Sequence, residues 1–147
     1  MKLQTASAVI SLARRLENES ALFYEDLSQR YSKGKDMFAA FARENRKNVV
    51  QLERAYYGVI SDAIEGCFAF DIAPEAYTIE TTLARTATYR DALSKAVELE
   101  EKIGKFYSDA AEQSKSLMAD VPRAFALIAS KRDERRTKLR SLLSEEN

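Results

Sequence analysis

Apolar and polar residues alternate with helical spacing along most of this chain. Apolar or small residues recur at steps of three and four in four stretches, which predicts helices over about residues 5–31, 36–58, 86–117 (or from 88) and 120–147. Only four Gly and two Pro interrupt 147 residues, which favours long helices and few turns. We expect Asp36 and Asp120 to be N-caps, with Pro122 in the first turn of the last helix.

The connections predict the topology. Short turns join the first helix to the second and the third to the fourth, so each pair should form an antiparallel hairpin. The link from Gly58 to about residue 86 is long enough to cross a whole bundle. The pattern therefore predicts an all-α fold of two helical hairpins joined by a long crossover.

A single carboxylate interrupts the apolar face of each hairpin's first helix. Glu17 and Glu100 occupy these positions, and each is followed seven residues later by a tyrosine, Tyr24 or Tyr107. The two faces are Ile10, Ala13, Glu17, Ser20, Tyr24, Leu27 and Tyr31, and Leu93, Ala96, Glu100, Ile103, Tyr107, Ala110 and Ser114. A buried carboxylate needs a metal, a cation or a proton.

The second helices of the hairpins also repeat. Phe-x-x-hydrophobic-Ala and a later leucine occur in both, as Phe38, Phe41, Ala42 and Leu52 and as Phe125, Ile128, Ala129 and Leu139. The chain therefore consists of two copies of one hairpin, which favours a pseudo-twofold bundle.

These repeats resemble the rubrerythrin-related branch of the ferritin-like superfamily. The resemblance rests on the Glu, the Phe-Tyr that begins six positions after it, and the Phe-x-x-hydrophobic-Ala of the next helix. It implies a single ferritin-like four-helix-bundle domain over residues 1–147. It also implies a di-iron centre held by one Glu from each first helix and a Glu-x-x-His from each second helix. Glu17 and Glu100 match the first-helix ligands.

The remaining four ligand positions of the family carry different residues. Asn45 and Asn48 stand in one hairpin and Arg132 and Arg135 in the other, and the chain has no histidine. Two carboxylates facing two guanidinium groups sum to zero charge, and arginine binds carboxylates through paired hydrogen bonds. We therefore predict a buried Glu/Arg/Asn network at vestigial metal-site positions, with no cofactor and no catalytic residue.

Three alternatives stay open at this point. The two arginines could lie at a helix margin, with the stem buried and the head in water. Tyr24 and Tyr107 could be ordinary core aromatics rather than second-shell partners of the network. A residual di-iron site could use Glu17, Glu100 and Glu44, whereas Glu134 should face water. With such a site, the resemblance implies an oxidoreductase that reduces peroxide or oxidises iron.

The composition of the chain bears on which classes of partner it can bind and where it is located. Lys plus Arg equals Asp plus Glu at 23 each, which gives no general attraction to nucleic acid or to a membrane, and the basic run 131–140 is interpreted as a solvated helix face. With no long apolar segment and no signal sequence, we expect a cytoplasmic protein. The only cysteine, Cys67, should be a small packed side chain.

The apolar crossover around Phe68–Tyr77 should cover a bundle edge or contact a second subunit, and the resemblance implies a homodimer. We expect a structural or interaction protein whose partner the residues do not identify. A small molecule held between the helices is a further option.

Overall fold

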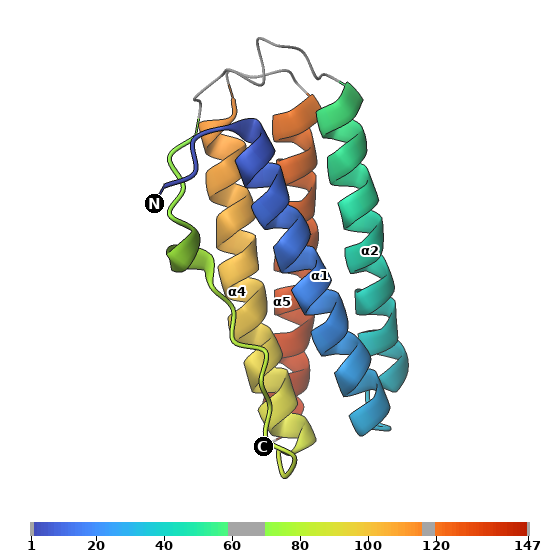
Figure 1. Ribbon diagram of the computed structural model, residues 1–147. Helices are drawn as coiled ribbons and strands as arrows, with labels where there is room; N and C mark the ends of the chain where they lie inside the picture. The colour runs from blue at the N-terminus through green and yellow to red at the C-terminus, as the bar shows by residue number, and fades with distance from the viewer. Residues whose placement is uncertain (1, 59–69, 116–119, 147) are drawn as a thin grey trace.

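The computed structural model describes residues 2–58, 70–115 and 120–146, which form a bundle of four long helices (Figure 1). The helices are α1 (Ala6–Arg30), α2 (Lys35–Gly58), α4 (Tyr89–Gln113) and α5 (Asp120–Glu145), with a short 3-10 helix, η1 (Pro74–Tyr77). The closest packing is between α1 and α2 and between α4 and α5. The predicted all-α class and the four helices are therefore confirmed.

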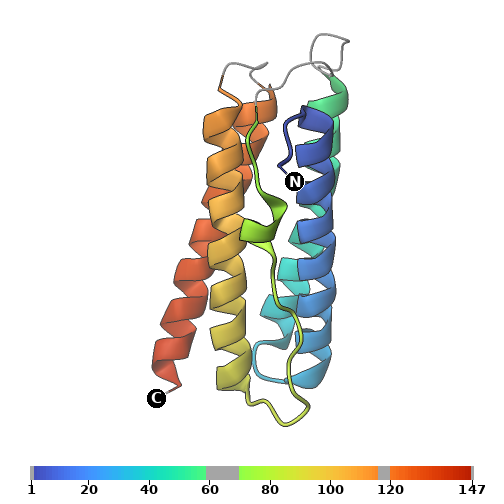
Figure 2. The same ribbon diagram turned by 60° about the vertical axis from the view of Figure 1, so that its left-hand side comes forward.

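The described part of the crossover, residues 70–88, runs along the length of the bundle beside α4 (Figures 1 and 2). As a result α4 points in the same direction as α2, and α5 in the same direction as α1. An isolated antiparallel bridge fixes the crossover to the N-terminus, with Leu3 N–H donating to Ile72 O at 2.6 Å and Ile72 N–H to Leu3 O at 3.0 Å.

The crossover also contributes to the core. Phe70, Ile72, Tyr77 and Ile79 are all buried against the helices. Of the two roles expected for this segment, its described residues cover an edge of the bundle. Cys67 and Phe68 lie outside the described residues.

The helix boundaries follow local capping. Thr5 caps α1 by accepting a hydrogen bond from Ala8 N–H, and Thr88 and Asp91 form a reciprocal capping box at the start of α4. The prediction for α2 was wrong at its start: Phe38 N–H donates to Gly34 O at 2.9 Å, so the helix begins at Lys35 and Asp36 lies inside its first turn.

The end of α4 also differs from the prediction. The helix ends at Gln113, because Ser114 leaves the helical conformation at φ −95° and ψ 8° while its N–H still bonds to Ala110 O. Leu117, the predicted end, lies outside the described residues. Asp120 is the first described residue of α5, so the structure gives no view of what precedes it.

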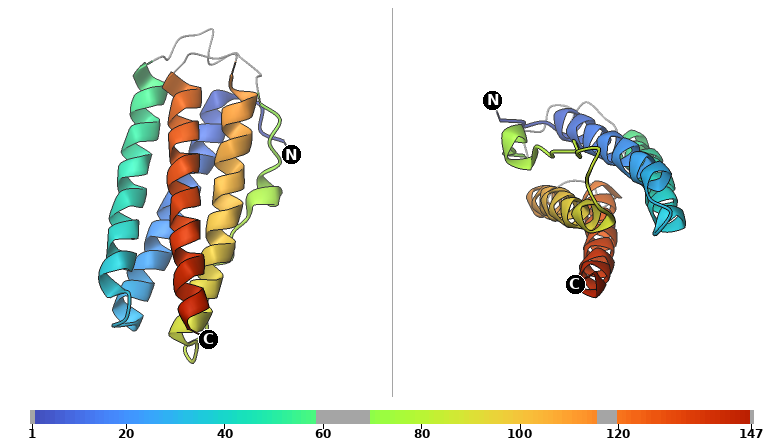
Figure 3. Two further views of the ribbon diagram at one scale, coloured as in Figure 1. Left: turned by 180° about the vertical axis from the view of Figure 1, so that it is seen from behind. Right: turned by 90° about the horizontal axis from the view of Figure 1, so that it is seen from below.

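The core lies where the inward faces of the four helices meet along the bundle axis (Figure 3). Both faces predicted from the sequence point inward: all their residues are buried except Tyr31, which is partly covered. No helix within the described ranges combines the length and the apolarity that a membrane span requires.

The turn between α1 and α2 depends on one glycine. Gly34 has φ +79°, and an added Cβ would come within 3.1 Å of the Tyr89 ring and 3.3 Å of Phe38. Gly34→Ala should therefore lower the free energy of unfolding by about 1–2 kcal/mol, measured by chemical denaturation. Gly104→Ala is the matched control, since its Cβ would meet only Arg132 Cβ at 3.9 Å, and it should be neutral or stabilising by up to about 1 kcal/mol. Equal losses in both variants would contradict the strain at Gly34.

Candidate functional site: a buried ion-pair network

One arginine lies between two buried glutamates at the centre of the bundle. Arg132 of α5 donates through Nη1 to both oxygens of Glu100 at 3.0 and 2.8 Å, and through Nη2 to Glu17 Oε2 at 2.6 Å. All three side chains are inaccessible to solvent. Arg132 Nη2 also donates to Ser20 Oγ at 3.0 Å. A single guanidinium group thus joins α1, α4 and α5.

The two repeated tyrosines form hydrogen bonds from one hairpin to the other. Tyr24 of α1 donates to Glu100 Oε2 on α4 at 2.5 Å, and Tyr107 of α4 donates to Glu17 Oε2 on α1 at 2.8 Å. Each tyrosine therefore bonds to the glutamate of the other hairpin, and both rings are fully buried. Of the two roles left open for them, the hydroxyls act as partners of the polar network.

The second helix of each hairpin completes the network. From α2, Asn48 Nδ2 donates to Glu17 Oε1 at 3.0 Å, and Asn45 Oδ1 accepts from Arg135 Nη1 at 2.9 Å. From α5, Arg135 Nη1 also reaches Glu100 Oε2 at 3.4 Å. Its other amino group, Nη2, bonds to Glu44, which is half-buried.

Arg135 is also held by aromatic rings. Its guanidinium carbon lies 4.4 Å from the centre of the Phe41 ring and 5.4 Å from that of Tyr24. Such cation–π contacts favour a desolvated arginine. Both arginine heads are therefore inside the bundle, and neither lies at a wet helix margin, since Arg132 is 0% and Arg135 3% exposed.

The two carboxylates keep Arg132 positively charged. Burial alone would lower the pKa of Arg132, but the Glu100 and Glu17 carboxylates outweigh burial and raise that pKa well above its ordinary value. Burial is the main cause that raises the pKa of Tyr24 and of Tyr107, and the adjacent carboxylate raises each further. Both tyrosines are therefore neutral donors at any physiological pH.

Hydrogen bonding is complete on the two carboxylates but not on the asparagines and arginines around them. Every oxygen of Glu17 and Glu100 accepts at least one hydrogen bond. In contrast, Asn45 Nδ2, Asn48 Oδ1 and the Nε atoms of both arginines are buried without a partner among the described residues. The network is thus built around the two acids rather than around the amides.

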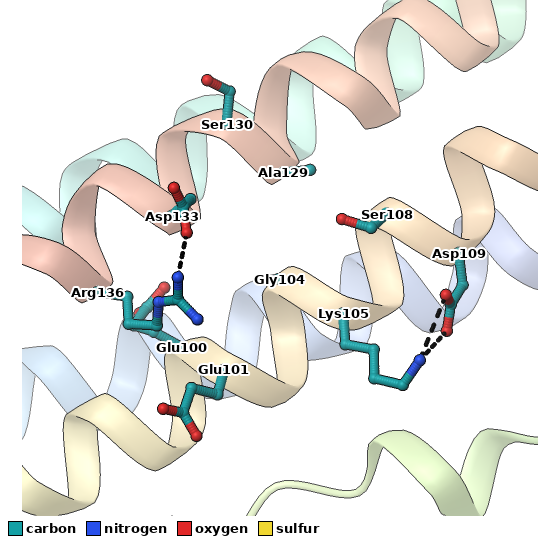
Figure 4. Close-up of a pocket in the computed structure, with 10 residues that line it drawn as sticks. All are labelled: Glu100, Glu101, Gly104, Lys105, Ser108, Asp109, Ala129, Ser130, Asp133 and Arg136. Atoms are coloured by element: carbon teal, nitrogen blue, oxygen red, sulfur yellow. Dashed lines mark hydrogen bonds and ion pairs between the residues drawn. The ribbon is translucent and has the colours of Figure 1, made fainter.

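A groove between α4 and α5 reaches the edge of this network (Figure 4). It has a volume of about 630 Å³, and Glu100 and Gly104 contribute to its wall. Charged residues on its rim are paired with each other, as in Lys105–Asp109 at 3.1 Å and Arg136–Asp133 at 2.5 Å. Because these rim charges are paired and Glu100 is bound to Arg132, the groove offers no free charged group from these residues.

The donor set does not fit a di-iron centre. Both glutamates are bound to Arg132, the positive charge of Arg135 lies beside Glu100, and Glu44 is bound to Arg135. No three His, Cys, Asp or Glu side chains in the described part of the chain gather closely enough to hold a metal ion. A divalent cation at this position would have to displace a guanidinium group from each carboxylate.

The structure brings all six predicted site residues together, along with both tyrosines. Glu44 reaches only the margin of the network and Glu134 is exposed. Sequence reasoning missed Ser20 and Phe41 as contacts of the arginines, although Ser20 lies on the same helix face as Glu17. Comparisons with protein-family models, with curated proteins and with solved structures found no match.

Removing the central arginine should strongly destabilise the fold. Arg132→Met leaves two buried carboxylates without their main cation, so the free energy of unfolding should fall by about 3–5 kcal/mol in chemical denaturation. The matched control is Arg136→Met on the same helix, because its pair with Asp133 is exposed and its loss should cost less than about 1 kcal/mol. Adding Glu100→Gln to Arg132→Met should recover part of the loss. If Arg132→Met costs no more than Arg136→Met, the network does not hold the bundle together.

Because of the two buried tyrosines, Tyr24 and Tyr107, we expect the free energy of unfolding to fall at alkaline pH. Their pKa values are raised in the folded protein, so above about pH 10 the unfolded chain releases protons that the folded chain retains. The free energy of unfolding should then fall by about 1 kcal/mol per pH unit for each tyrosine. In Tyr24→Phe the curve should be flatter by that amount above pH 10 and parallel to the wild-type curve between pH 6 and 9. Parallel curves over the whole range would contradict the buried, carboxylate-bound hydroxyl.

Proposed function

We propose that this protein is a metal-free, ferritin-like helical bundle that serves as a structural or interaction protein. A buried Glu/Arg/Asn network takes the place that a di-iron centre has in the rubrerythrin-related branch. The observation that carries the proposal is Arg132, whose guanidinium group binds both Glu17 and Glu100. These are the two acids that match the family's first-helix ligands.

The chain path supports the ferritin-like part of the proposal. The crossover runs the length of the bundle, so α2 and α4 point the same way, whereas a simple up-and-down bundle would alternate (Figure 2). The reciprocal Tyr–Glu bonds also relate the two hairpins by an approximate twofold exchange. The homodimer and the cytoplasmic location expected from the sequence belong to this proposal.

The chemistry of the centre supports a role without catalysis at that position. The carboxylates are committed to cations, the tyrosines are neutral, and no histidine is present to transfer protons near neutral pH. These groups neutralise one another and leave no free base or nucleophile among them. A bundle of this kind acts through its shape and its surface.

Metal analysis tests the proposal directly. Protein purified without chelators should contain far less than one iron or manganese per chain by elemental mass spectrometry, and added Fe²⁺ should not raise its thermal midpoint. The variant Asn45→Glu, Asn48→His, Arg132→Glu and Arg135→His restores the family's ligand pattern and should bind two ions per chain. Near-stoichiometric iron in the wild-type protein would overturn the proposal and favour a di-iron oxidoreductase with atypical ligands.

A further inference from the structure

Some surface cations on α2 and α5 pair with carboxylates of the neighbouring helices. Arg46 binds Glu25 of α1, and Arg140 binds Glu101 of α4. On the side where α2 and α5 face each other, five cations have no hydrogen bond or ion pair within the described residues. These are Lys47, Arg54, Arg123, Lys131 and Lys138.

These cations line three adjoining pockets, together called the α2/α5 groove, between two helices that lie side by side (Figure 3, left). Its middle part, about 420 Å³, shares Arg54 and Gln51 with a part of about 290 Å³ toward the start of α5. The middle part shares Lys131 with a smaller part of about 160 Å³ toward the end of α5. From residue 123 to residue 138 the groove is about 22 Å long, which corresponds to four turns of helix.

The groove is apolar along its floor and rim as well as cationic. Val50 is 48% exposed and Leu127 is 44% exposed, and they belong to the few large apolar side chains that face solvent in the described structure. Ala55 and Ala124 line the part toward the start of α5, where their short side chains leave room. Two carboxylates without a partner among the described residues, Asp120 and Glu134, stand near its two ends, so the lining retains an excess of positive charge.

We propose that the α2/α5 groove binds an acidic amphipathic helix of a protein partner. An apolar stripe on that helix would cover Val50 and Leu127, and carboxylates on its flanks would pair with Lys47 and Arg54 on one side and Arg123 and Lys131 on the other. This inference rests on the proposed function, because it names the class of partner that a non-catalytic interaction protein would take.

The lining favours a helix over a nucleic acid. Exposed aliphatic side chains gain free energy when apolar surface covers them, whereas a phosphate backbone would leave Val50 and Leu127 in water. The aromatic ring in the lining of the described groove, Phe41, is partly buried and has the Arg135 guanidinium group 4.4 Å from its centre, so it is not a free platform for base stacking. The chain as a whole carries no net charge that would attract a polyanion.

The test uses a designed peptide of about 16 residues, with leucine every third or fourth position and glutamate on both flanks, labelled for fluorescence anisotropy. Wild-type protein should bind it at low ionic strength, and added salt should weaken the binding. The double variant Lys47→Glu with Lys131→Glu should bind at least about tenfold more weakly. Lys35→Glu with Arg85→Glu is the matched control: both residues are exposed, lie outside the groove and have no side-chain partner among the described residues, and this variant should bind like wild type.

Further probes separate the alternatives. A peptide with the same composition but no apolar stripe, and one with lysine for glutamate, should both bind at least about tenfold more weakly than the designed peptide. Equal weakening in both double variants would overturn the inference, as would tighter binding of a single-stranded oligonucleotide of equal charge. A wild-type dimer that dissociates only in the groove variant, seen by sedimentation, would assign the groove to a second copy of the chain and also overturn it.

Failure of the partner inference and failure of the proposed function can be told apart by experiment. Metal analysis of the same preparation decides whether the centre is free of iron. Metal-free protein that does not bind the peptide would overturn the partner inference alone, whereas iron-loaded protein that binds it would overturn the metal-free proposal alone.

Discussion

The bundle depends on Arg132, because this side chain makes it possible to bury two carboxylates. Glu17 and Glu100 are 0% and 1% exposed, and removing an ionised group from water costs several kcal/mol even after the protein relaxes. The guanidinium group offsets that cost by donating to both acids at 2.6–3.0 Å. The tyrosine hydroxyls and Asn48 donate further hydrogen bonds to the acids, and Ser20 accepts one from the guanidinium group.

The hydrogen bonds of this network fit only one register of the helices. Apolar contacts are non-directional, so an interior of leucine and phenylalanine alone would tolerate small slips between helices. A slip of one residue turns a side chain by about 100°, and a slip of one turn moves it by about 5.4 Å, which exceeds any hydrogen bond in the network. Tyr24 and Tyr107 reach across to opposite glutamates, so both hairpins must be in register at once.

Helical periodicity is sufficient to predict which residues point inward, and insufficient to predict which of them pair. The stripe around Glu17 and its repeat around Glu100 follow from steps of three and four along one helix, so their burial could be predicted. The bridging of both acids by Arg132, and the separate pairing of Arg135 with Asn45 and Glu44, depend on distances between helices that the spacing does not contain. The start of α2 was misplaced for a different reason. It depends on the left-handed conformation of Gly34 in the turn, which the spacing of apolar residues does not predict.

The basic run 131–140 shows how rotation about one helix axis gives neighbouring residues different roles. Arg132 and Arg135 point inward and neutralise the buried acids. Arg136 and Arg140 pair with carboxylates on the side toward α4, where Arg140 binds Glu101. Lys131 and Lys138 line the α2/α5 groove and have no ion-pair partner in the part of the chain that the structure describes. Adjacent residues on a helix differ by about 100° in direction. A segment that looks like one charged patch in the sequence therefore supplies buried charges, paired surface charges and unpaired groove charges within the described structure.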